Sequence, residues 1–149
     1  MCSSDLTARA VQLDSTDPSA WAWRAAALAS LGRWNAALEA SAIAIRLDPY
    51  EPRWYLLRAD DLIRMARLDD ALETANRALA LYPGSGIATA KVCEVQVLRG
   101  RTEEAIAACE RASGYEDYWP IHLALAAAYA NHAVVPGAHR IGRGVRGLP

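Results

Sequence analysis

The sequence repeats itself with a period of 34 residues, and few folds are compatible with such a period. When the chain is shifted by that length, small residues fall into columns. One column holds Ala10, Ala44, Ala78 and Ala112, and a second holds Ala37, Ala71 and Ala105. Further columns hold Gly32, Ala66 and Gly100, then Arg33, Arg67 and Arg101, then Pro49 and Pro83. This regularity predicts stacked copies of one structural unit.

Each period has the signals of two helices. Asp17-Pro18 begins the first helix, because Asp caps helices and Pro suits the first helical position. Gly32 ends it, since glycine readily adopts the left-handed conformation found after helices. A second helix is expected over 34–47 before Asp48-Pro49. In the next period we expect Glu51-Pro52 to begin the first helix and Asp69 to cap the second.

Composition supports an all-helical chain. Hydrophobic residues make up 53%, many of them alanine, and phenylalanine is absent. Alanine is the best helix former and lets helix backbones approach closely. No hairpin turn or sustained alternation of apolar and polar residues indicates strands.

The aligned columns resemble the tetratricopeptide repeat (TPR) family. The resemblance is carried by Trp21 and Tyr55, Ala25 and Ala59, Leu28 and Leu62, and by the glycine, alanine and proline columns above. It implies a right-handed α-solenoid of antiparallel helix pairs, with full repeats at 18–51, 52–85 and 86–119. We expect a partial repeat at 1–17, with an artefactual start, before these repeats, and the first helix of a further repeat at 120–133 after them. We expect residues 134–149 to form an irregular tail, and the chain to be a fragment of a larger bacterial protein.

Two columns depart from the family pattern. Arg24 and Arg58 stand where leucine is common, so their aliphatic stems are expected to pack while the charged heads reach water. Ser41, Ala75 and Cys109 stand where a large aromatic residue is common, which predicts a thinner layer of second helices.

Charge and targeting signals exclude several classes of function. The net charge of −1 gives no electrostatic basis for direct binding of nucleic acid. No apolar run is long enough to span a membrane, and no secretory signal is visible. We therefore predict a cytoplasmic protein in a reducing compartment, without a disulfide framework among Cys2, Cys93 and Cys109.

The sequence predicts no catalytic, metal or cofactor site. His122, His132 and His139 lack the spacing of metal ligands. The adjacent acids Asp60-Asp61, Asp69-Asp70 and Glu103-Glu104 point in different directions on a helix, so we interpret them as caps and solvated residues. Cys93 and Cys109 are expected to lie close together as small packing residues rather than as a redox pair.

The TPR resemblance implies that the first helices of the repeats line a concave groove that binds a protein or peptide. The groove-facing columns are Ser19, Trp23 and Ala26, then Arg53, Leu56, Asp60, Ile63 and Arg64, then Ala90, Lys91, Glu94 and Val97. Trp23, Arg53, Asp60, Arg64, Lys91 and Glu94 are the predicted binding residues. Arg53, Arg64 and Lys91 could pair with acidic groups, and simple solvation of each residue is the alternative.

The resemblance leaves two hypotheses for function. The first is a protein-interaction scaffold. The second is a regulatory or substrate-presenting arm of a cyclase, glycosyltransferase or winged-helix regulator. Some family members clamp chaperone C-terminal tails with lysine, arginine and asparagine. Here Ala26, Asp60 and Glu94 occupy the column where an asparagine is expected, so we predict no such clamp. An uncovered terminal repeat would also favour self-association.

Overall fold

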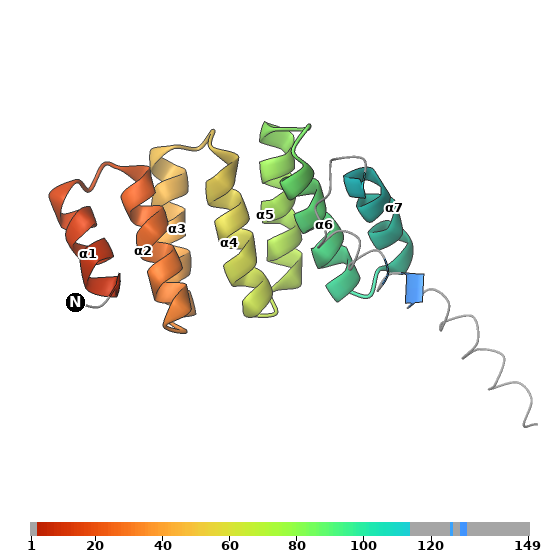
Figure 1. Ribbon diagram of the computed structural model, residues 1–149, viewed down its shortest axis with the longest axis horizontal. Coiled ribbons are helices and arrows are strands. Elements are labelled where there is room, and N and C mark those ends of the chain that lie inside the picture. Colours follow the sequence, from red (N-terminus) through yellow and green to blue (C-terminus); the bar gives the residue numbers. More distant parts are fainter. Residues whose placement is uncertain (1–2, 114–125, 127–128, 131–149) are drawn as a thin grey trace, which may run out of the picture. The chain divides into compact units, whose positions relative to one another are not determined.

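The computed structural model describes residues 3–113, 126 and 129–130. This part of the chain contains seven α-helices and no strand, which confirms the all-α prediction (Figure 1). The helices are α1 (Ser3–Leu13), α2 (Pro18–Ser30), α3 (Trp34–Leu47), α4 (Pro52–Arg64), α5 (Leu68–Leu81), α6 (Gly86–Leu98) and α7 (Thr102–Ser113). None of these helices has the length and apolar character that a membrane crossing requires.

The chain divides into two compact units, residues 1–88 and 89–149, and α6 begins in the first and continues in the second. In the first unit, α2 packs most extensively against α3, and α4 against α5. Fewer contacts join α1 to α2, α3 to α4 and α2 to α4. Sequential helices of this unit therefore form pairs, and each pair packs against the next (Figure 1).

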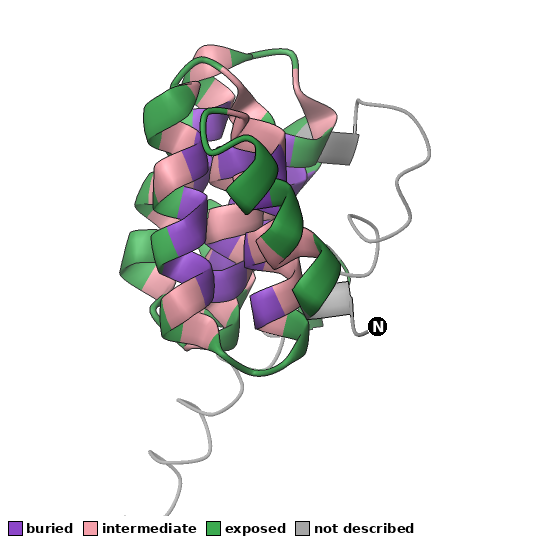
Figure 2. Ribbon diagram, turned by 90° about the vertical axis from the view of Figure 1, so that its left-hand side faces the viewer, coloured by how far each residue is buried: buried purple, intermediate pink, exposed green. Residues whose placement is uncertain are grey.

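Alanine dominates the places where helices meet. Ala25, Ala37, Ala44 and Ala59 are fully buried, and Ala25 and Ala37 belong to a cluster with Leu28 and Ala40. Buried residues occupy the sides of helices that face other helices, and exposed residues the outer sides (Figure 2). The small side chains of the repeated columns thus allow close packing of helix backbones.

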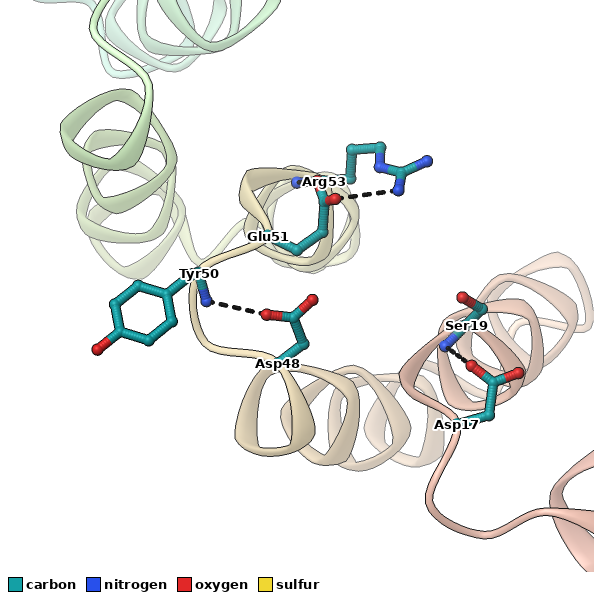
Figure 3. Close-up of polar contacts among 6 residues, drawn as sticks. All are labelled: Asp17, Ser19, Asp48, Tyr50, Glu51 and Arg53. Atoms are coloured by element: carbon teal, nitrogen blue, oxygen red, sulfur yellow. Dashed lines mark hydrogen bonds and ion pairs between the residues drawn. The ribbon is translucent and has the colours of Figure 1, made fainter.

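Acidic caps fix the starts of α2 and α4, as predicted. The Asp17 carboxylate accepts a hydrogen bond from the Ser19 backbone N–H at 2.8 Å, and Glu51 accepts one from the Arg53 N–H at 3.1 Å (Figure 3). In the connection before α4, Asp48 accepts a hydrogen bond from the Tyr50 N–H at 3.3 Å. The predicted cap at Asp69 is wrong. Helix α5 already begins at Leu68, so Asp69 lies in the first turn, where the helix dipole favours its charge.

The first helix of each pair ends in a left-handed residue. Gly32 and Gly100 have φ values of +72° and +69°, and Ala66 occupies the same column with φ +57°. After α2, the Arg33 N–H donates to the Leu28 carbonyl oxygen and the Gly32 N–H to that of Ala29, each at 2.9 Å. This pairing satisfies carbonyl groups that the helix leaves open. Ala66 adopts the same conformation without glycine's freedom.

Some predicted segments fall largely or wholly outside the described residues. The helix expected at 120–133 is described only at residues 126 and 129–130, and the expected tail at 134–149 is not described at all. The histidines His122, His132 and His139 also lie outside the described part.

Candidate functional site

The residues of the first unit that the sequence predicts to face a groove lie on α2 and α4. Trp23 of α2 is 70% exposed, and Arg53 and Arg64 of α4 are also exposed. The other positions, Ser19, Ala26, Leu56, Asp60 and Ile63, are half-buried. We call these eight residues the first-helix face. They recur at helical spacing on the sides of α2 and α4 that point away from α3 and α5.

Arg53 lies at the N-terminal end of this face and is already paired. Its Nη2 donates to the Glu51 Oε2 at 3.0 Å (Figure 3). Its guanidinium carbon also lies 5.3 Å from the Trp54 ring centroid. The hydrogen bond from Arg53 holds the pKa of Glu51 below its ordinary value. The charge of Arg53 is therefore partly neutralised within its own helix end.

Arg64 lies at the opposite end of α4. Its guanidinium carbon is 5.9 Å from the ring centroid of Trp34, the first residue of α3. Arg64 makes no ion pair with any described residue. Beside Trp34 lies a shallow pocket of about 360 Å³, which Met65 and the 32–36 segment line. Arg64 is thus an oriented cation with its charge open to a partner.

Asp61 corrects the interpretation of the acidic pairs as solvated residues. Its side chain is on the packed side of α4 and only 2% exposed, and its Oδ2 has no hydrogen-bond partner among the described residues. Burial raises the pKa of Asp61 to about 6, and the neighbouring Asp60 carboxylate acts in the same direction, against Arg64 and Arg58. Adjacent helix residues point about 100° apart, so Asp60 can lie on the outer side while Asp61 faces the core.

The second unit contains the predicted residues Lys91 and Glu94. The Lys91 Nζ lies 2.7 Å from the Glu94 Oε2, so the two charges form an ion pair on α6. Ala90, expected to face the groove, is 8% exposed and therefore buried. This pair belongs to the second unit, whereas the first-helix face belongs to the first.

Cys93 and Cys109 are closer than packing neighbours. Their sulfurs form a disulfide that joins α6 to α7, with the Cα atoms 4.9 Å apart. The sequence correctly predicts their proximity, but the expectation of a reduced, purely packing pair is wrong in this structure. Both side chains are fully buried, so they also fill space between the two helices.

The sequence did not predict a pocket that lies on the side of α4 opposite the first-helix face. It has a volume of about 400 Å³ and is lined by α3, α4 and α5; we call it the second-helix pocket. Arg58 lines it and donates from Nη1 to the Leu38 carbonyl oxygen at 2.7 Å and to Ser41 Oγ at 3.4 Å. Two departures from the TPR pattern could have indicated this pocket. Arg58 stands where leucine is common, and the small residues Ser41 and Ala75 stand where a large aromatic residue is common.

Among the described residues, no group of three histidine, cysteine or acidic side chains has the arrangement of a metal site. The structure therefore offers two candidate sites. One is the first-helix face, which has charges of both signs and the exposed Trp23, and the other is the second-helix pocket, which contains the half-buried Arg58.

Solved TPR structures are similar to this chain. A thermophilic TPR protein of Thermus thermophilus matches with a TM-score of 0.77 and 25% identity, over 87% of this chain and 72% of that one. The first TPR of Spaghetti (RPAP3), bound to an HSP90 peptide SRMEEVD, matches with a TM-score of 0.74 and 21% identity, over 80% and 96% of the two chains. The structure of MamA matches with a TM-score of 0.74 and 18% identity, over 90% and 79%.

Comparison of the sequence alone finds less. No protein-family profile matches it, and a search of curated proteins finds no match. The repeat period, the paired helices and the likeness to solved structures nevertheless agree. The chain therefore has the fold of tetratricopeptide-repeat proteins.

Proposed function

We propose that the chain is a protein-interaction scaffold that holds a peptide, or a segment of a partner protein, against the first-helix face. The observation that carries this proposal is the 70% exposure of Trp23. A tryptophan left open to water contributes little to the core. At an interface it can bury a large area while its N–H bonds a partner, which is why tryptophan is common among binding hot spots.

The chemistry of the first-helix face narrows the kind of peptide. Leu56 and Ile63 add half-buried apolar surface on α4, and Arg64 adds a cation without an ion pair among the described residues. We therefore infer that the peptide has an apolar or aromatic residue that packs on Trp23 and an acidic residue that pairs with Arg64.

The related TPR of Spaghetti is bound to an HSP90 peptide, which supports peptide binding as the general function. For this chain we propose binding without a clamp on the C-terminal carboxylate. Ala26 and Asp60 occupy the column where the clamp asparagine is expected, and Asp60 would repel a carboxylate. We further propose that the chain binds its partner without catalysing a reaction, and that it does so in the cytoplasm. The same face could serve a stand-alone scaffold or an arm of a larger protein.

Selection from a random peptide library displayed on phage tests this function. Selected peptides are synthesised and titrated by calorimetry against the wild type and against Trp23→Ala and Arg64→Gln. We expect Trp23→Ala to weaken binding by about tenfold or more, since hot-spot side chains contribute at least about 2 kcal/mol. Arg64→Gln should weaken acidic peptides selectively.

Tyr50→Ala is the matched control, because Tyr50 is an aromatic residue that is 81% exposed outside the first-helix face. It should leave the affinity within about twofold of the wild type. Peptides that bind all variants equally would refute the proposed site. Failure to select any peptide would count against the proposed function itself.

A further inference from the structure

The second-helix pocket is separate from the first-helix face. Tyr55 and Arg58 line the pocket from α4, whereas Arg53, Leu56 and Asp60 of the same helix belong to the first-helix face. With 3.6 residues per turn, these two sets lie on opposite sides of α4. The pocket therefore needs an explanation of its own.

Arg58 is held in place but keeps unused donors. Its Nη1 is bonded to the Leu38 carbonyl oxygen and to Ser41 Oγ, both on α3. A guanidinium has five N–H donors, and no other hydrogen bond or ion pair joins the Arg58 guanidinium to the described residues. Burial lowers the pKa of Arg58, but arginine remains protonated in proteins. A half-buried cation thus faces the pocket without an ion-paired carboxylate.

The rest of the lining sets the charge of a suitable ligand. Arg77 adds a second positive charge and Glu73 one negative charge, both on α5, and neither forms an ion pair with a described residue. The hydroxyls of Tyr55 and Thr74 donate to the backbone oxygens of Pro49 and Asp70. The charged lining therefore sums to one positive charge, which suits a singly charged anion better than a dianion.

The α3 wall is apolar. Ala42 and Ile45 form this side, and the pocket volume of about 400 Å³ exceeds what a bare inorganic anion fills. A ligand that carries a short aliphatic chain would cover the wall while its charged group reaches Arg58.

We propose that the second-helix pocket binds a carboxylate carried on a short aliphatic chain, with the carboxylate on Arg58 and Arg77. Two sources have this chemistry, a free aliphatic acid and the C-terminal residue of a peptide. The proposal does not depend on the function of the first-helix face, which uses other residues.

NMR titration of the full chain tests the proposal. The probes are butyrate, the peptide N-acetyl-Gly-Val with a free C-terminus, the same peptide as its C-terminal amide, and inorganic phosphate. We expect butyrate or the free-acid peptide to shift the Arg58 Nε–H signal and backbone amides near Ala42 and Glu73. The stronger of these two probes identifies the source. The peptide amide should bind at least about tenfold more weakly because it loses the charge-assisted hydrogen bond. Phosphate should bind at least about tenfold more weakly because it lacks the apolar contact.

Three variants make the test specific. Arg58→Gln should weaken carboxylate binding by at least about tenfold. Because Arg58 also bonds α3, Arg77→Gln provides a second test at a residue of α5, with a loss of about threefold or more. Arg24→Gln, in the same repeat column as Arg58 but on α2, should bind as the wild type does.

Several results would overturn the proposal. One is that neither butyrate nor the free-acid peptide shifts any NMR signal of the pocket. Others are that the peptide amide binds as tightly as the free acid, or that phosphate binds as tightly as butyrate. Full affinity of both Arg58→Gln and Arg77→Gln for the carboxylates would also overturn it. Trp23→Ala should leave carboxylate binding unchanged, which separates this site from the first-helix face.

Discussion

Arg58 of α4 donates a hydrogen bond across to the backbone carbonyl oxygen of Leu38 in α3, at a distance of 2.7 Å. The same Nη1 lies 3.4 Å from Ser41 Oγ, and Ser41 is fully buried. An arginine in a column where the family favours leucine thus meets a serine in a column where it favours a large aromatic. The two departures are matched, because the small serine leaves room for the guanidinium.

This match predicts energetic coupling between the two positions. Arg58→Leu alone removes the hydrogen bond, and Ser41→Tyr alone crowds the guanidinium, so each should lower the free energy of unfolding. The double variant restores the family combination and should lose less than the sum of the single losses, by about 0.5–3 kcal/mol. Urea unfolding measures all four proteins.

Arg46→Leu, at an arginine of α3, the helix that also carries Ser41, provides the control for that cycle. Combined with Ser41→Tyr it should show additive losses. Additivity within about 0.5 kcal/mol for Arg58 as well would disprove the coupling.

The second prediction concerns the left-handed residue that follows α4. Ala66 has φ +57°, whereas Gly32 has φ +72° and no heavy atom within 4 Å of an added Cβ. Ala66→Gly should raise the free energy of unfolding because it removes the strain of an alanine in the left-handed conformation. The gain should be at most about 1 kcal/mol, because glycine also adds entropy to the unfolded chain. Gly32→Ala should do the reverse. Thermal unfolding of both variants checks the signs, and a destabilised Ala66→Gly protein would contradict the account.

The third prediction follows from the raised pKa of Asp61. Its pKa is about 6 in the folded protein against an ordinary value of 3.8, so the folded state favours the protonated form. The resulting stability is fully present below about pH 4 and is lost as pH rises through about 6. Asp61→Asn should therefore stabilise the protein at pH 7.5 by up to about 2 kcal/mol and flatten its stability between pH 5 and 7.5.

Asp5→Asn, on an exposed side chain of α1, is the comparison for Asp61→Asn. It should retain the pH dependence of the wild type. If the two variants follow the same pH profile in urea unfolding, the buried carboxyl is not its source.

The fourth prediction concerns the disulfide between α6 and α7. Cys93 and Cys109 are 16 residues apart, so opening the bond should lower stability by about 3 kcal/mol. Thermal unfolding with and without dithiothreitol measures this loss. The variant with both Cys93→Ala and Cys109→Ala should be insensitive to the reductant. Thiol titration of the unreduced, denatured wild type should find only Cys2 free, and three reactive thiols would contradict the pairing.

Much of the fold can be predicted because local signals and the repeat agree. Asp17 and Glu51 cap helices where the sequence expects them, and Gly32 ends α2. Asp69 fails as a cap because α5 begins at Leu68, one period after Trp34 begins α3, so Arg67 precedes the helix and Asp69 lies within it. The sequence marks this turn less clearly in the second repeat, because Ala66 stands where Gly32 ends the first helix of the first repeat.

The site is less predictable because it depends on contacts between repeats. Trp23 and Arg64 can be placed on the outer sides of helices by periodicity alone. The burial of Asp61 and the bond from Arg58 to Leu38 depend instead on how α4 packs against its neighbours. No spacing within one repeat records that packing. The Cys93–Cys109 bond depends likewise on the distance between two helices, which the sequence gives only approximately.

The most direct measurement of the central claim is NMR mapping of a phage-selected peptide on the full chain. Binding through the first-helix face predicts shift changes at the Trp23 indole N–H and at amides around Ala26, Asp60 and Arg64. Residues that line the second-helix pocket, such as Ala42 and Arg77, should stay unchanged. Changes confined to the pocket, or absent from α2 and α4, would contradict the claim that this repeat protein holds its partner on its first helices.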